Sequence, residues 1–299
     1  MTTKWSISVP GSTANLGPGF DSIGLALGLY LKLDVTLQDH WEFEHRSEHL
    51  PINVKVEDHL VYKVAKETAE RYKATLPSCK VVMHSELPLA RGLGSSASAI
   101  VAGIELTNQV CDLQLSIEER CKFASKIEGH PDNAAASVYG GLTIASTLPN
   151  GQLELINARD IDAAFAVFIP NVELKTEEAR KALPSNYDKA YAVHASAHAN
   201  MLTASLLIKD YERAGKFMEH DLFHEPFRAN LIPNYHEIRQ TAQDAGAFGT
   251  AISGAGPTVI SLISKDRIDA LVAKMKPLFP SYDIKAVPID TKGVQVTRE

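Results

Sequence analysis

Apolar and polar residues alternate along several short segments of the chain, and this period of two is typical of half-buried β-strands. In the first half, the pattern predicts strands over residues 5–9, 31–37, 41–45 and 142–146 and an apolar segment over 79–83. A period of three to four predicts helices there over residues 59–72, 97–110 and 116–128. In the second half, the same reasoning predicts strands over 163–169, 247–252, 259–263 and 282–287, and helices over 187–208, 233–246 and 267–275.

Local signals predict where some of these elements end. Ser116 and Glu119 form a capping box at the start of a helix, and Gly129 is expected to end it. A further short helix is expected from residue 134 to just before residue 140, with Asp132 or Asn133 as its cap. Residues 10–21 are rich in Gly, Pro and Asn, so we expect a loop there.

The turn signal at residues 149–151 predicts a boundary between two domains, 1–150 and 151–299. The elements of the second half follow the order strand, helix, helix, strand, strand, helix, strand. This order is close to that of a split βαβ sandwich. We expect the two halves to meet over one cleft.

Composition narrows the classes of protein to which the chain can belong. It has 299 residues, 45% hydrophobic and 22% charged, which is ordinary for a soluble globular enzyme. The net charge of −6 argues against a nucleic-acid partner, which calls for a clustered basic face. Its three cysteines, distant in sequence, are expected to be reduced thiols. With no membrane-length apolar run and no signal-peptide pattern, we expect a cytoplasmic protein; the sequence leaves the oligomeric state open, a homodimer included.

A glycine- and serine-rich segment between the apolar residues 79–83 and the helix at 97–110 is the strongest candidate for a binding site. It reads Pro88, Leu89, Ala90, Arg91, Gly92, Leu93, Gly94, Ser95, Ser96, Ala97, Ser98. Its two glycines allow sharp bends close to a ligand, and the unpaired amides at the start of the helix favour an anion. It lacks the lysine of a P-loop and the third glycine of a dinucleotide fingerprint. The alternative is an ordinary glycine turn that caps a helix.

Three segments together resemble the GHMP small-molecule kinases, the family of galactose, homoserine, mevalonate and phosphomevalonate kinases. They are residues 10–21, the glycine- and serine-rich segment, and residues 253–258, and they occur in the order expected for that family. Within the family, residues 15–21, 128–133 and 228–233 are most similar to the homoserine kinases. The resemblance implies an N-terminal domain with a left-handed βαβ crossover and a ferredoxin-like C-terminal domain. It also implies phosphorylation of L-homoserine by ATP with Mg²⁺, a step of threonine biosynthesis.

The resemblance assigns residues 88–98 to the nucleotide phosphates and His59 to the adenine. Relatives often carry Asn at that last position, so the choice of nucleotide base stays open. Ser96 and Glu128 are the Mg²⁺ ligands implied, and Ser95 is expected to cap the helix while Ser96 faces the ligand. A carboxylate at the C-terminal end of a helix is unfavourable, which a cation at Glu128 would offset. Alternatives are a plain cap for Ser96 and a solvated surface side chain for Glu128.

The turn at residues 130–133 is the candidate for the part of the site that contacts the reacting hydroxyl of the substrate. We expect His130 and Asn133 to position it, whereas Asp132 as a true base is the less favoured hypothesis. Asp and Asn caps would explain part of this turn without any function.

Four residues are candidates for binding an amino-acid substrate. Asp21 is the only charge in residues 11–31 and could hold an α-ammonium group, and Asn15 is assigned to the substrate beside it. The resemblance selects Arg180 and Arg228 as the clamp on a carboxylate, which guanidinium groups bind through two parallel hydrogen bonds. Each arginine could instead be a surface ion-pair partner, and Asn15 a turn former.

The turn containing Gly254, Gly256 and Thr258 is expected to be a bend between two strands that supports the shape of residues 88–98. Two rival functions remain open at this point. A different GHMP kinase would act on mevalonate, a sugar or another amino acid, and a non-catalytic protein of the same fold would sense nucleotides.

Overall fold

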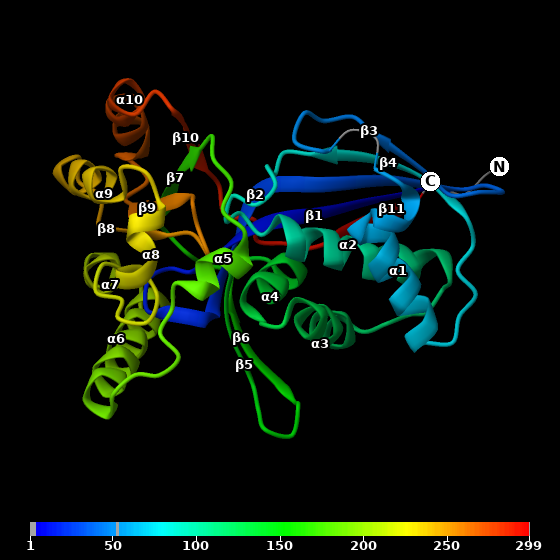
Figure 1. Cartoon of the computed structure of the whole chain (residues 1–299), viewed down its shortest axis with the longest axis horizontal. Coiled ribbons are helices and arrows are strands. Elements are labelled where there is room, and N and C mark those ends of the chain that lie inside the picture. The colour runs from blue at the N-terminus through cyan, green and yellow to red at the C-terminus, as the bar shows by residue number, and fades with distance from the viewer. Residues whose placement is uncertain (1–3, 52–53, 299) are drawn as a thin grey trace.

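The computed structural model describes residues 4–51 and 54–298, and the chain forms two lobes, each built around its own β-sheet (Figure 1). The first sheet has the order β11-β1-β2-β4-β3, with β5 paired to β2 and β6 paired to β5. Its strands are β1 Lys4–Asn15, β2 Gly19–Leu37, β3 Glu42–His45, β4 Cys79–Ser85, β5 Leu142–Thr147, β6 Leu153–Ala158 and β11 Gln295–Arg298. Strands β3 and β4 run parallel, so the chain between them makes a crossover connection.

Helices cover one side of this sheet (Figure 1). They are η1 Val56–Asp58, α1 Leu60–Arg71, α2 Ser95–Val110, α3 Ile117–Glu128 and α4 Asp132–Tyr139. Helix α2 is buried along most of its length because small and aliphatic residues face its neighbours on several sides. This burial fixes the N-terminus of α2, and with it the serine residues of the candidate phosphate site.

The second sheet has the order β10-β7-β9-β8, and all its neighbours are antiparallel. Its strands are β7 Ala164–Pro170, β8 Gly249–Ile252, β9 Val259–Ile263 and β10 Tyr282–Val287. The helices of this half are α5 Thr176–Lys181, α6 Lys189–Leu207, α7 Tyr211–Met218, α8 Glu225–Arg228, η2 Ala229–Leu231, α9 Tyr235–Asp244 and α10 Ile268–Leu278. The strand order 4-1-3-2 along the chain is that of the ferredoxin-like sandwich, which confirms the expected fold of this half.

The structure corrects two local predictions. Residues 10–21 are mostly strand, because β1 continues to Asn15 and β2 begins at Gly19. A register shift between Pro10 and Gly11 lets the strand absorb a proline that cannot donate a ladder hydrogen bond. The predicted strand at 31–37 is therefore only the C-terminal third of β2.

The expected caps are correct for one helix and wrong for two. Both bonds of the capping box between Ser116 and Glu119 are present at α3. At α2 the cap is Gly94, in the left-handed conformation with φ 69°, and Ser95 is already helical. Helix α4 begins at Asp132 itself, so neither predicted residue caps it, and Asp132 binds its neighbours instead.

The predicted domain boundary near residue 150 falls inside the β5–β6 hairpin of the first sheet, and β11 also returns to that sheet from the end of the chain. The division at 150 stays a prediction. All three cysteines are free thiols. Among the residues described, no helix combines the length and the apolar character needed to cross a membrane.

Candidate active site

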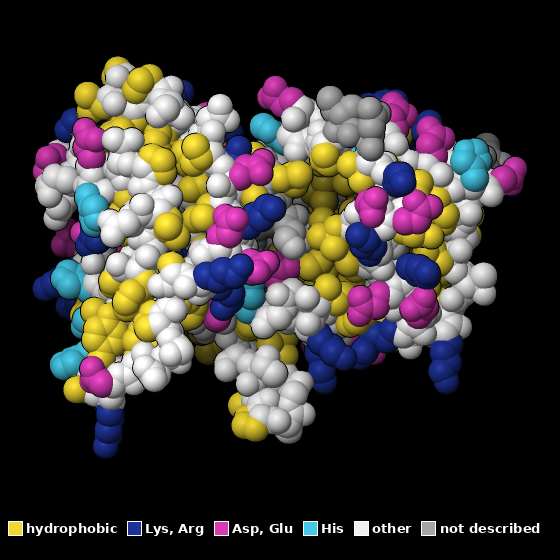
Figure 2. Space-filling view, viewed as in Figure 1, with side chains coloured by type: hydrophobic (Ala, Val, Ile, Leu, Met, Phe, Trp, Pro, Cys, Tyr) yellow, Lys and Arg dark blue, Asp and Glu magenta, His cyan; other side chains and the backbone are white. Residues whose placement is uncertain are grey.

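Two cavities meet at the start of α2. The first, of about 250 Å³, has charged side chains in its wall, among them Asp21, Glu128 and Arg180, and is called the polar cavity. The second, of about 300 Å³, has mainly apolar walls and is called the apolar cavity. They share Ala90, Ser95 and Ser96. Figure 2 shows acidic, basic and histidine side chains gathered in the middle of this face, next to a hollow with hydrophobic walls. A ligand with an apolar end and an anionic end could therefore lie across the start of α2, with an acceptor in the polar cavity.

The glycines of the candidate phosphate site allow close packing, Gly94 against Ser12 of β1 and Gly92 against the second lobe. Gly92 and Gly94 have φ of 77° and 69°, in the left-handed region. A Cβ on Gly92 would lie 2.3 Å from the carbonyl oxygen of Ser253 and 2.9 Å from that of Gly256. The Ser253 hydroxyl donates to the Gly92 carbonyl at 2.5 Å, and the Thr258 amide donates to the Arg91 carbonyl at 3.2 Å. The C-terminal turn thus holds this bend.

Five residues predicted to bind nucleotide line neither of these two cavities: Pro88, Arg91, Leu93, Ala97 and Ser98. Arg91 instead donates to the Pro170 carbonyl at 3.1 Å and so ties the segment to the second lobe. Leu93 is fully buried, and the Ser98 hydroxyl donates to the Pro10 carbonyl at 2.9 Å. The contacts of Arg91, Leu93 and Ser98 thus hold the segment in place from the side away from the two cavities.

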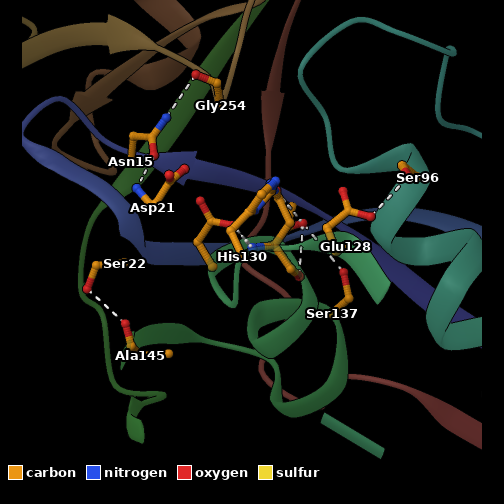
Figure 3. A network of polar contacts seen from close by, with 12 residues as sticks. Asn15, Asp21, Ser22, Ser96, Glu128, His130, Ser137, Ala145 and Gly254 are labelled. Atoms are coloured by element: carbon orange, nitrogen blue, oxygen red, sulfur yellow. Dashed lines mark hydrogen bonds and ion pairs between the residues drawn. The ribbon is translucent and has the colours of Figure 1, made fainter. Parts of the chain in front are cut away.

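Ser96 and Glu128 place two oxygen atoms beside the start of α2 (Figure 3). The Ser96 hydroxyl donates to Oε2 of Glu128 at 3.0 Å. Burial raises the pKa of Glu128, although His130 and Ser96 act in the opposite direction. A hard cation would relieve the cost of burying this carboxylate, and hydroxyl and carboxylate oxygens are ligands that Mg²⁺ accepts. The residues present therefore fit such an ion.

His130, Asp132 and Asn133 form one bonded group at the start of α4. Oδ1 of Asp132 accepts from the backbone amide of Asn133 at 2.7 Å and pairs with Nδ1 of His130 at 2.5 Å. Burial alone would lower the pKa of His130, but the bond to Asp132 and the surrounding carboxylates outweigh it and raise that pKa. The Ser12 hydroxyl donates to Oδ1 of Asn133 at 2.9 Å. Asn133 lines the polar cavity, and its side-chain nitrogen Nδ2 is left to donate there.

Asn15 and Asp21 flank the turn between β1 and β2 (Figure 3). The Asn15 side chain accepts from the Asp21 amide at 3.0 Å and donates to the Gly254 carbonyl at 2.9 Å. Arg180, at the end of α5, donates to both carboxylate oxygens of Asp21, at 2.8 Å and 3.2 Å. Two residues 159 positions apart in the sequence thus pair directly in the wall of the polar cavity.

Arg228 is almost fully buried, with 2% of its surface exposed, and still lines the polar cavity. It donates to the carbonyl oxygens of Ala179 at 3.2 Å and Gly254 at 3.4 Å. Burial first, and the nearby charge of Arg180 second, lower the pKa of Arg228 to about 10, so it remains a cation at neutral pH. The guanidinium carbons of Arg228 and Arg180 lie 5.4 Å and 5.8 Å from the centre of the Phe20 ring. One aromatic ring thus holds both predicted clamp residues.

His59 lines the apolar cavity. It is buried and stacks on Phe43, with the ring centres 4.1 Å apart. Burial lowers the pKa of His59, and the nearby charge of His45 acts the same way, so we expect a neutral ring. The predicted base-contacting residue and the predicted phosphate segment therefore border one cavity.

Comparisons with known proteins identify relatives of this chain along nearly its whole length. Residues 59–141 match the family model "GHMP kinases N terminal domain", and residues 201–280 match "GHMP kinases C terminal". A homoserine kinase from Oceanobacillus iheyensis is 49% identical over 98% of this chain and 99% of its own length. The chain belongs to the GHMP kinase family. A homoserine kinase from Streptococcus suis is 44% identical, over 97% of this chain and 99% of the relative.

Solved structures of the GHMP kinase family share the whole architecture. The crystal structure of a homoserine kinase from Cytophaga hutchinsonii has a TM-score of 0.85 and 27% identity, and the match covers 98% of this chain and 97% of that one. A mevalonate kinase from L. major has a TM-score of 0.75 at 18% identity, over 95% of each chain, and shows the fold alone.

Sequence reasoning missed part of the wall of this GHMP kinase site. Leu174, Lys175, Thr176 and Ala255 line the polar cavity, and Phe20 lies against both arginines. The first three lie just before and at the start of α5, whose six residues are too few to show a helical period. For Phe20, its place directly before Asp21, the lone charge of its stretch, was the one available signal.

Proposed function

We propose that this GHMP kinase transfers the γ-phosphoryl group of ATP to the side-chain hydroxyl of L-homoserine, giving O-phospho-L-homoserine in threonine biosynthesis in the cytoplasm. One observation carries the proposal. Two guanidinium groups and the carboxylate of Asp21 line the same cavity as the start of α2. A zwitterionic acceptor needs both charges, whereas mevalonate lacks the ammonium group and a neutral sugar lacks both.

The nucleotide would lie across the two cavities. The apolar cavity beside His59 takes the base, and the amides at the start of α2 take the phosphates, because an anion is favoured at a helix N-terminus. Ser96 and Glu128 would hold Mg²⁺. The ion, when bound, neutralises charge on the transferred phosphoryl group.

The acceptor would be fixed by its two charged ends. Asp21, held by Asn15, takes the α-ammonium group. Arg180 and Arg228 take the carboxylate, and Phe20 keeps their guanidinium groups together. Since phosphoryl transfer depends mainly on position and charge, this alignment of the hydroxyl is a large part of catalysis.

The hydroxyl would lie near Asn133 and His130. The amide nitrogen of Asn133 can donate to the hydroxyl oxygen, because Ser12 already occupies Oδ1. Asp132 already binds His130 and the backbone amide of Asn133. These contacts suit Asp132 to orienting the His130 ring rather than to accepting the substrate proton.

The test is ADP release measured with a panel of hydroxyl acceptors: homoserine, mevalonate, galactose and serine. We expect turnover with homoserine well above the others. In Arg228→Lys the homoserine KM should rise roughly tenfold or more, because lysine cannot form the paired bonds, while the ATP KM stays within about twofold. An equal rise in both KM values would refute the clamp, and absence of turnover with homoserine would refute the proposed acceptor.

A further inference from the structure

Two carboxylates close the free edge of the second sheet. Strand β8 is the last in the order β10-β7-β9-β8, so alternate amides along it point away from any strand partner. The Thr250 amide donates to Oε1 of Glu219 at 3.0 Å, and the Ile252 amide donates to Oε1 of Glu225 at 2.6 Å. These two matched contacts lie two residues apart on one edge.

Glu225 connects two parts of the candidate active site, which Glu219 does not. It begins the helical turn α8 that ends in Arg228, and its amide partner Ile252 directly precedes the turn 253–258. The Gly254 carbonyl of that turn accepts from Arg228 at 3.4 Å and from Asn15 at 2.9 Å. The Glu225 carboxyl therefore joins the segment that carries Arg228 to the turn that Arg228 contacts.

The second oxygen of Glu225 is fixed as well. Oε2 lies 2.6 Å from the hydroxyl of Tyr235, which donates when Glu225 is ionised and can accept when it is protonated. Glu225 is 4% exposed, and burial first, then the charge of Asp221, raise its pKa to about 8. The charged or titratable groups that face it are Asp221, Tyr235 and Arg239. Both carboxyl oxygens thus have partners from different segments.

We propose that Glu225 is a positioning residue for the acceptor, which sets Arg228 against the turn 253–258 through the Ile252 amide. This inference rests on the proposed function, because the acceptor carboxylate is the group that Arg228 would hold. The competing interpretation is that Glu225 only stabilises the edge of β8, as Glu219 does two residues earlier.

Kinetics separate the two interpretations. In Glu225→Ala we expect the homoserine KM to rise roughly tenfold while the ATP KM stays within about twofold. Glu225→Gln keeps an acceptor for the Ile252 amide, so its homoserine KM should stay close to that of the unmodified enzyme. The matched control Glu219→Ala removes the neighbouring edge contact and should leave the homoserine KM near that of the unmodified enzyme. An equal rise in Glu219→Ala, or no rise in Glu225→Ala, would overturn the proposal.

A second variant covers the case in which Glu225→Ala does not fold. Tyr235→Phe removes only the hydroxyl that fixes Oε2, so the homoserine KM should rise in the same direction by a smaller factor. An unchanged homoserine KM in Tyr235→Phe would assign Glu225 to stability alone.

Amide hydrogen exchange tests the same placement without any substrate. Removing the Glu225 carboxyl, or the Tyr235 hydroxyl, should speed exchange in residues 252–258, and Glu219→Ala should speed it only near Thr250. If the unmodified protein does not phosphorylate homoserine, the proposed function fails, and the exchange pattern still decides whether Glu225 holds the turn. Equal exchange in residues 252–258 for all variants would overturn the inference.

Discussion

Asp21 and Arg180 bind each other through two parallel hydrogen bonds, 2.8 Å between Oδ1 and Nη2 and 3.2 Å between Oδ2 and Nη1. Their side chains are 35% and 39% exposed, so solvent screens the pair and its opening costs little. An α-amino acid carries the two charges that could replace this contact, an ammonium group for Asp21 and a carboxylate for Arg180. If the two residues bind the acceptor as proposed, each partner of the ion pair stands in for one end of a zwitterion.

Removing the charge of Asp21 should weaken binding of the acceptor and leave binding of the nucleotide unchanged. In Asp21→Asn, we expect the homoserine KM to rise about 10- to 100-fold, the range expected for loss of a hydrogen bond to a charged group. The residue has φ 52°, which Asn tolerates, so the backbone should stay in place. Steady-state kinetics with each substrate varied in turn measures the change.

The matched control for Asp21→Asn is Ser22→Ala. Ser22 is the next residue, but its hydroxyl donates away from the cavity to the Ala145 carbonyl at 3.0 Å (Figure 3). Its loss should leave the homoserine KM within about twofold. The interpretation of Asp21 as the ammonium partner fails if Asp21→Asn raises the ATP KM as much as the homoserine KM.

Asp132→Asn should reduce turnover moderately. The new side chain can still accept from the backbone amide of Asn133, but it lacks the charge that supports His130. We therefore expect kcat to fall by about 10- to 100-fold. Loss of a true general base would cost more, on the order of 10⁴-fold. Single-turnover measurements, which isolate the chemical step, distinguish these ranges. A fall of the larger size would make Asp132 the base and reverse the interpretation of this turn.

The sequence predicted most elements because their signals are local. The capping box at Ser116 and the glycine at 129 each act within one helical turn, and both bounds are confirmed. The strand at residues 10–15 was missed because Pro10 and Gly11 are turn residues by composition, and only pairing with β2 shows that a bulge absorbs them. Local chemistry predicts an element well where no distant strand overrides it.

The candidate site was predictable only as a set of residue types. A charge alone in an uncharged stretch drew attention to Asp21, but nothing local shows that Arg180 lies opposite it, 159 positions away. Likewise, Glu225 is an ordinary acidic residue in the sequence, and its contact with the Ile252 amide depends on tertiary packing. The family resemblance supplied the two arginines because it carries information about such distant contacts.

Removing the proposed Mg²⁺ ligand Glu128 should change the metal requirement specifically. In Glu128→Gln, we expect the Mg²⁺ concentration for half-maximal activity to rise roughly tenfold or more, because the charged ligand is lost. Ser96→Ala should act in the same direction by a smaller factor, since a neutral hydroxyl contributes less. Calorimetric titration of Mg²⁺ into the complex with a non-hydrolysable ATP analogue gives a readout independent of turnover.

The homoserine KM, measured at saturating Mg²⁺, serves as the control for both variants and should change little. If Mg²⁺ binding to the nucleotide complex is the same in both variants as in the unmodified protein, the ion is held elsewhere, and the contact between Ser96 and Glu128 only orients the start of α2.

Glu225 should make the stability of the protein depend on pH in a defined direction. Its pKa is about 8 in the folded protein, against the ordinary value of 4.5 expected in the unfolded chain. Between these values the folded state binds more protons than the unfolded state, so its free energy of unfolding falls as pH rises through this window. Glu225→Gln cannot ionise and loses this dependence, while its amide can still bond to the Ile252 amide and the Tyr235 hydroxyl.

We therefore expect Glu225→Gln to become more stable relative to the unmodified protein as pH rises from about 4.5 to about 8, with little further change above that. Urea denaturation at pH 5, 7 and 9 measures the difference in the free energy of unfolding. Equal m-values would show that both proteins expose the same surface on unfolding. A difference that stays constant or shrinks with rising pH would show that Glu225 is already ionised in the folded protein at low pH. The Tyr235 hydroxyl would then be a donor throughout, and the carboxyl would hold the Ile252 amide as a buried anion.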